Sequence, residues 1–193
     1  MSTTQSDAVQ LEIPGFEIGA LAWGEPGAPP VLGMHGWLDN AATLSRVAEY
    51  LEGYRLVSID FPGHGRSGRR PRGQAYHFVD LIPVIFDVVD ALGWEDFSVL
   101  AHSMGAAASL LAAGTRPERL DRMVLVDGLG PWSTPPEKAP ELLRDGLDER
   151  ATLLEKSNRR FDSLENALDV ICEVYALERH EARPLVERGV IDD

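Results

Sequence analysis

The feature that most restricts the fold of this chain is a serine placed between an apolar strand and a helix, within residues 96–114. Residues 97–101 are an apolar run of strand length, and an alanine-rich segment of helical length follows Ser103. Ala101 and Gly105, two places before and two places after this serine, are small, so the strand and the helix can lie close together. The pattern is a nucleophile elbow, G-x-S-x-G, with alanine in its first place. It predicts that the Ser103 hydroxyl is exposed at the carboxyl end of a strand.

Strands and helices alternate along the first two thirds of the chain. Residues 10–23 predict a hairpin of two edge strands, and further buried strands are predicted at residues 31–34, 54–59, 97–101 and 122–126. The helix predicted after residues 31–34 is capped by Asp39 or Asn40, and its buried face carries Leu44, Val47, Ala48 and Leu51. Parallel strands that are almost continuously apolar need cover on both faces. The fold class is therefore α/β, a mostly parallel sheet flanked by helices.

Composition argues against several classes of partner. A net charge of −13 opposes binding to nucleic acid or to an anionic membrane. The sequence shows no secretory leader and no apolar run that could span a bilayer. Cys172 is the single cysteine, so no internal disulfide is possible. We therefore expect a cytoplasmic protein in which Cys172 is a small core residue.

The sequence changes character after residue 130. A break at Trp132 is followed by charge-rich segments with helical patterns at residues 137–156, 163–177 and 181–188. The sequence predicts no further strand in residues 131–193. Residues 1–130 and 131–193 are therefore expected to be separate parts of the fold, a sheet-containing core and a helical appendage.

Four motifs occur in a recognisable order, at residues 34–41, 60–67, 101–105 and 123–128. With them the sequence resembles the α/β-hydrolase-fold serine hydrolases. Residues 35–41 and 185–190 are similar to those of the serine hydrolase-like proteins within that superfamily. The resemblance implies that residues 131–193 are the start of a lid over the pocket.

The resemblance also implies roles for individual residues. Ser103 would be the nucleophile that accepts an acyl group, and the backbone amides of Trp37 and Met104 would form the oxyanion hole. The site would be shaped by His35, Gly36 and Gly105. A small-molecule acyl substrate is implied, with no cofactor. No spacing of metal ligands is visible in the sequence.

The chain departs from the family pattern at its end. The fold usually places its catalytic histidine after the last strand, beyond the lid, whereas this sequence ends at Asp193. We therefore expect a chain truncated within the lid, lacking the last strands and the histidine that would activate the serine. Asp127 could be the acid partner, although a turn-capping carboxylate is the alternative. Without its last strands the sheet would leave residues 122–126 as an open edge, which predicts self-association or a complementary C-terminal segment.

Five histidines could in principle replace the missing base. His64 lies in a loop at the active end of the sheet, and His180 lies on a lid helix, so both are candidates. His35 is expected to be structural, His102 to point to the opposite face of the strand, and His77 to be distant. The run of arginines at residues 66–72 is expected to be a solvated loop.

Three functions remain open. The first is hydrolysis of an ester, thioester, lactone or small amide through an acyl-enzyme, and the second is a catalytically inert fragment or binding module. The third is C–C bond hydrolysis or cofactor-free peroxidation on the same scaffold, since fold alone does not separate these reactions. A serine in the elbow, in place of aspartate, speaks against haloalkane or epoxide chemistry.

Overall fold

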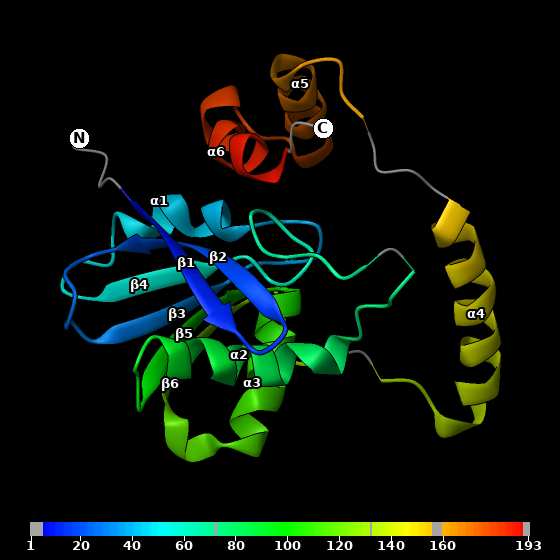
Figure 1. The fold of residues 1–193 in the computed structure, drawn as a ribbon, viewed down its shortest axis with the longest axis horizontal. Helices are drawn as coiled ribbons and strands as arrows, with labels where there is room; N and C mark the ends of the chain where they lie inside the picture. Colours follow the sequence, from blue (N-terminus) through cyan, green and yellow to red (C-terminus); the bar gives the residue numbers. More distant parts are fainter. Residues whose placement is uncertain (1–5, 72, 132, 156–159, 191–193) are drawn as a thin grey trace.

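The computed structural model describes residues 6–71, 73–131, 133–155 and 160–190 (Figure 1). The described residues form one mixed sheet whose spatial order is β1-β2-β4-β3-β5-β6. Its strands are β1 Asp7–Ile13, β2 Phe16–Trp23, β3 Pro30–Met34, β4 Arg55–Ile59, β5 Phe97–His102 and β6 Leu120–Val126. The last four strands run parallel to one another, and β2 is antiparallel to both of its neighbours, β1 and β4. The predicted α/β class and the mostly parallel sheet are confirmed.

The first hairpin differs from its prediction in one respect. β1 and β2 pair around Gly15, whose φ of 84° favours glycine. Only β1 is an edge, because β2 also pairs with β4 through Ala20 and Ile59. The prediction of two edge strands was wrong. The burial of the second half of β2 is the physical reason, since those residues lie between two neighbours in the sheet.

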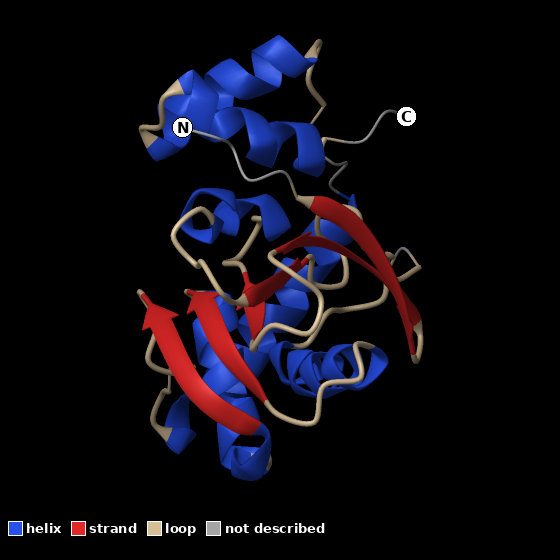
Figure 2. Cartoon of the chain, turned by 90° about the vertical axis from the view of Figure 1, so that its left-hand side faces the viewer, coloured by secondary structure: helices blue, strands red, loops and turns tan. Residues whose placement is uncertain are grey.

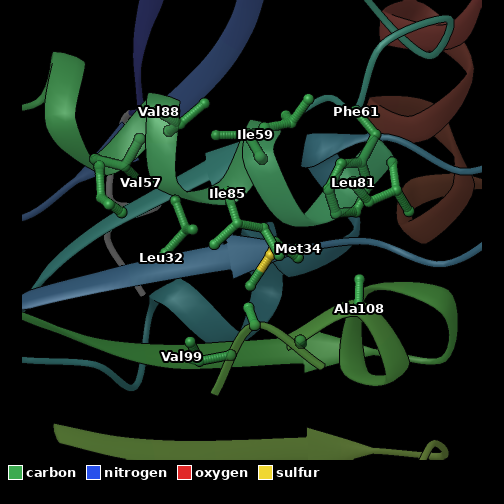
Figure 3. Close-up of a cluster of buried hydrophobic side chains, with 14 of the residues drawn as sticks. Leu32, Met34, Val57, Ile59, Phe61, Leu81, Ile85, Val88, Val99 and Ala108 are labelled. Atoms are coloured by element: carbon green, nitrogen blue, oxygen red, sulfur yellow. The ribbon is translucent and has the colours of Figure 1, made fainter. Parts of the chain in front are cut away.

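Helices cover both faces of the sheet, and the core is divided between the faces. α2 Leu81–Ala91 and α3 Met104–Thr115 lie on one side, and α1 Ser45–Ala48 lies on the other (Figure 1). Leu32 and Val57 from the central strands pack with Ile85 and Val88 of α2 in the larger cluster (Figure 3). These buried apolar side chains fix the carboxyl ends of the strands relative to the helices that begin there.

The helix after β3 is shorter than predicted. A 3₁₀ turn, η1 Ala41–Leu44, precedes the single turn of α1. The side chain of Asn40 accepts a hydrogen bond from the Ala42 amide at 3.0 Å, which confirms one of the two predicted caps. Val47, predicted on the buried face, is 41% exposed. A 3₁₀ turn contains three residues rather than 3.6, so the segment leaves the face that a continuous α-helix would keep.

The remaining helices follow the sheet in the chain. They are η2 Phe78–Asp80, η3 Pro117–Arg119, η4 Pro136–Lys138, α4 Ala139–Glu155, α5 Leu164–Tyr175 and α6 Arg179–Gly189. Three helices after residue 130 were predicted at these places, and α6 begins two residues earlier than expected at a capping box of Glu178 and Glu181. The predicted break at Trp132 and the predicted end at Lys156 lie outside the described residues. No described helix has the length and apolar character needed to cross a membrane.

α5 and α6 pack as a pair and dock onto the core (Figures 1 and 2). The Asn40 side chain donates to the Leu185 carbonyl at 2.9 Å, and Arg66 donates to the Glu187 carbonyl at 2.7 Å. Asn40 and Arg66 lie in the loops that follow β3 and β4. The helical pair therefore sits at the carboxyl ends of these parallel strands, where functional loops gather in such sheets.

α4 and β6 present apolar side chains to solvent. Leu143 and Leu147 on α4 are 70% and 65% exposed. Val124 and Val126 on β6 are 57% and 49% exposed, and β6 ends the sheet with β5 as its neighbour. Among the described residues, this edge is open, as the sequence predicted.

Candidate active site

The turn between β5 and α3 holds Ser103 in a strained backbone conformation. Its φ of 48° and ψ of −109° are rare for a residue with a side chain. The Ser103 amide donates to the Val126 carbonyl at 2.9 Å, and the Ala107 amide donates to the Ser103 carbonyl at 3.0 Å. These contacts with β6 and α3 hold the turn. Such a strand–turn–helix serine is the geometry of a nucleophile elbow.

Close packing explains why the neighbours of this serine are small. A Cβ on Gly105 would lie 2.8 Å from the His35 carbonyl oxygen, which is too close for any side chain. Gly128, which the sequence analysis did not single out, has the same restriction, since its Cβ would lie 2.7 Å from the backbone carbonyl oxygen of Ser103. Ala101 is fully buried. The residues at the ends of β3 and β6 therefore both lie against the elbow.

The loop after β3 contacts the elbow directly. A Cβ on Gly36 would lie 2.9 Å from Nδ1 of His102 and 3.4 Å from Cβ of Ser103, so a side chain here would force the His102 ring or the loop to shift. The Met104 amide is the first of α3 and therefore has no acceptor within the helix. Trp37 and Met104 line the same cavity. The two predicted oxyanion residues thus share one cavity, and Met104 stands at a helix N-terminus that favours negative charge.

His35 is a neutral, buried side chain that cross-links this loop by hydrogen bonds. Its Nε2 accepts a hydrogen bond from the Phe61 amide at 3.0 Å, so Nδ1 carries the proton and donates to the Gly36 carbonyl at 2.7 Å. Burial lowers the pKa of His35 from 6.5 to about 4. The imidazole joins the loop after β3 to the loop after β4. This is the structural role that the sequence analysis expected for it.

His64 and His77 belong to the wall of the cavity shared by Trp37 and Met104, whereas His35 and His102 contact the loop of Gly36. The expectation that His77 is distant was therefore wrong. The loop that leads into η2 folds back toward the carboxyl ends of the strands, which sequence order does not reveal. Burial lowers the pKa of His64 below its ordinary value, and its ring centroid lies 5.8 Å from that of Trp37.

His102 and His180 stand in different surroundings. Nδ1 of His102 is buried and has no hydrogen-bond partner among the described residues, and it lies 2.9 Å from where a Cβ on Gly36 would stand. The ring thus packs against the residue that also touches Ser103. Its orientation toward the opposite face of the strand stays a prediction. His180 is exposed on α6. Across the described residues, no hydrogen bond joins a histidine to the Ser103 hydroxyl.

Asp127 follows β6 in a left-handed backbone conformation. Its φ is 52° and its side chain is exposed. A left-handed aspartate is common in turns, which suits the turn-capping alternative. The next residue, Gly128, lies against Ser103. The role of Asp127 as the catalytic acid therefore stays a prediction, and its neighbour Gly128 is the residue that contacts the elbow.

Asp60 is a buried anchor whose importance the sequence did not show. It is fully buried, and its carboxylate accepts hydrogen bonds from the amides of Ala41 at 2.6 Å and Arg66 at 2.8 Å. Arg188 of α6 forms a salt bridge with it at 2.8 Å. The two partners are 128 residues apart, which is why no local pattern indicated the pair. Asp60 therefore holds the loops after β3 and β4 and also fastens α6 to the core.

The arginines after Asp60 differ in their exposure to solvent. Arg66 and Arg69 are exposed, as expected for a solvated loop, although Arg66 also bonds to α6. Arg70 departs from the expectation because it is half-buried, forms a salt bridge with Asp80 at 2.8 Å and lies over the rings of Phe16 and Tyr76. Arg72 lies outside the described residues.

A cavity of about 240 Å³ lies beside Trp37 and Met104. Its walls come from β2, the loops after β3 and β4, the start of α2 and the start of α3. The lining residues are Phe16, Trp37, Pro62, His64, Arg70, Tyr76, His77, Phe78, Asp80, Leu81, Val84 and Met104. The described residues contain no group of three or more histidine, cysteine or acidic side chains that could hold a metal ion. Cys172 is half-buried in the packing between α5 and α6.

Comparisons with known proteins agree with this geometry. A serine hydrolase-like protein of Danio rerio is 31% identical over 95% of this chain, which spans 54% of that relative. A hypothetical protein of Pseudomonas aeruginosa PAO1 has a crystal structure with a TM-score of 0.90 and 40% identity, covering 97% of this chain and 66% of the other. The thioesterase domain from the curacin biosynthetic pathway follows at a TM-score of 0.83 and 26% identity, covering 98% of this chain and 69% of the other.

The family model of the alpha/beta hydrolase fold matches residues 29–163. The match includes β3, the loops after β3 and β4, the elbow and β6. The chain spans about half of the Danio rerio relative and about two thirds of the two solved structures. This chain belongs to the alpha/beta hydrolase fold family, within its serine hydrolase-like group.

Proposed function

We propose that this chain carries the nucleophile and the oxyanion hole of a serine hydrolase that acts on ester-like substrates. The substrate would be an ester, thioester, lactone or small amide of a small molecule. The fold and the serine hydrolase-like relatives support a hydrolase function in general. The strained Ser103, with the Gly36 loop packed against it and Met104 at the start of α3, carries the more specific proposal.

The reaction would proceed in two steps. Ser103 Oγ attacks the carbonyl carbon and gives its proton to a base, and the carbonyl oxygen becomes an oxyanion between the amides of Met104 and Trp37. The tetrahedral intermediate then expels the alcohol, thiol or amine, which takes up the proton, and leaves an acyl-serine. Water attacks the acyl-serine while the same base accepts its proton, and the base returns that proton to Ser103 Oγ as the carboxylic acid leaves.

A second candidate, an inert hydrolase-like module, is favoured by one observation. The described residues contain no histidine hydrogen-bonded to Ser103, and a serine hydroxyl is a weak nucleophile without a base. His64, a candidate base within this chain, lines the same cavity as Met104. The alternative is a histidine beyond this sequence, so activity belongs either to this chain or to a longer protein that contains it.

Acylation by p-nitrophenyl acetate tests the proposal. The wild-type chain should release a burst of p-nitrophenolate and gain one acetyl group on Ser103, identified by peptide mass spectrometry. Ser103→Ala should abolish both, and Ser109→Ala, which removes a buried serine one turn and a half along α3, should change neither. Folded wild-type protein that remains unacetylated at Ser103 would favour the inert module.

A further inference from the structure

The cavity beside the oxyanion residues has a chemical character of its own. Its walls are largely ring and aliphatic surface, to which Phe16, Tyr76, Phe78, Leu81 and Val84 contribute. It begins at Trp37 and Met104, whose amides would hold the carbonyl oxygen of a substrate. A substituent on that carbonyl can therefore extend into the cavity without leaving the site.

Its one strong cation is already paired. The guanidinium of Arg70 bonds to the Asp80 carboxylate at 2.8 Å and to the Ala75 carbonyl at 2.7 Å. Its central carbon also lies 5.7 and 5.4 Å from the ring centroids of Phe16 and Tyr76, which is within reach of cation–π attraction. A carboxylate that entered this cavity would lose water and would have to compete with Asp80 for Arg70.

The volume indicates how large a group the cavity can enclose. A cavity of about 150 Å³ in another protein holds benzene. The 240 Å³ present here admits a single ring with a few further atoms, about ten non-hydrogen atoms in all. A long alkyl chain would have to leave the cavity and lie in water.

From this size and pairing of charges, we propose that the cavity selects substrates whose reactive carbonyl carries an uncharged, compact aryl or cyclic alkyl group. The inference rests on the proposed function for its meaning, because Ser103 must react with the carbonyl. Binding of the group itself needs only the cavity.

Fluorine NMR of ligand binding tests the inference without requiring catalysis. 4-Fluorobenzamide, a neutral aryl carbonyl compound, should bind to the full chain at least tenfold more tightly than 4-fluorobenzoate, its anionic analogue. Ser103→Ala should bind both as the wild type does. Equal affinity for the two probes, or tighter binding of the benzoate, would overturn the inference.

Matched substitutions locate the binding. Val84→Phe places a ring in the cavity and should weaken binding of 4-fluorobenzamide at least tenfold, whereas Val79→Phe, at an exposed position of η2 outside the lining, should leave it within twofold. Should Val84→Phe fail to fold, Phe78→Trp fills part of the same space from a half-buried position and should also weaken binding. Unchanged binding in a folded filling variant would place the probe elsewhere and refute the inference. Tight benzamide binding with no acetylation of Ser103 would leave the cavity assignment standing and contradict only the proposed function.

Discussion

The buried imidazole of His35 makes a prediction about acid stability. Burial lowers the pKa of His35 from 6.5 to about 4 in the folded chain, while the unfolded chain keeps the ordinary value. Between these two values the unfolded state binds more protons than the folded state. The free energy of unfolding should therefore decrease as pH falls from about 6.5 to about 4, and this contribution should change no further at lower pH.

The size of the effect follows from the shift. One pKa unit corresponds to about 1.4 kcal/mol, so the full shift amounts to about 3 kcal/mol, of which about 2.5 kcal/mol is lost between pH 7 and pH 4.5. Protonation at Nε2 would also remove the acceptor of the buried Phe61 amide. The loop that carries Gly36 and Trp37 should loosen in the same pH range, because His35 joins it to the loop after β4.

Urea unfolding followed by circular dichroism measures this contribution. His35→Gln keeps a polar side chain but removes the titrating group, so it should be less stable than the wild type at pH 7 by about 1–3 kcal/mol. Its loss of stability from pH 7 to pH 4.5 should be about 2.5 kcal/mol smaller than that of the wild type. His180→Gln, at an exposed position, is the control and should retain the wild-type pH dependence. Identical pH dependence in wild type and His35→Gln would refute the neutral, buried His35.

Three further predictions concern packing and the sheet edge. Arg188→Met leaves the fully buried Asp60 without its cation and should lower the free energy of unfolding by about 3–5 kcal/mol, with faster hydrogen exchange in α6. Arg183→Met, whose ion pair with Glu165 is partly exposed, should cost less than about 1 kcal/mol. Equal losses in the two variants would contradict the role of Arg188 in anchoring α6. Gly128→Ala should destabilise the protein by about 1–3 kcal/mol, because its Cβ would lie 2.7 Å from the backbone carbonyl oxygen of Ser103. Gly114→Ala, with open space around it in α3, should stabilise the protein by up to about 1 kcal/mol in the same urea titration. Val124→Lys on the exposed face of β6 should reduce self-association in sedimentation velocity, and a wild-type chain that sediments as a monomer at all concentrations would contradict the edge prediction.

The sequence predicted most of the architecture because its signals are local. Apolar runs bounded by glycine gave the strands, and the small residues around Ser103 gave the elbow. Where regular geometry changes, the prediction failed: the 3₁₀ turn of η1 moved Val47 to the surface. β2 was assigned to an edge because pairing with β4 is a tertiary property that strand alternation does not encode.

The candidate site was only partly visible in the sequence. The elbow pattern indicated Ser103, and the resemblance to serine hydrolases implied Trp37 and Met104; all three follow the carboxyl ends of strands β3 and β5. The Asp60–Arg188 pair and the approach of His77 to the cavity join segments that are far apart in the chain. Such contacts depend on how the loops fold back, so a single sequence offers no signal for them.

The central claim is that Ser103 can act as a nucleophile beside a formed oxyanion hole. The most direct measurement is labelling of the folded chain with a fluorophosphonate, whose phosphoryl group mimics the tetrahedral intermediate, followed by peptide mapping. The account predicts one adduct, on Ser103, absent in Ser103→Ala and formed about 10²–10³-fold more slowly when Gly36→Ala displaces the loop that supplies the Trp37 amide. Labelling at another serine, or a Ser103 that stays unlabelled in demonstrably folded protein, would contradict it.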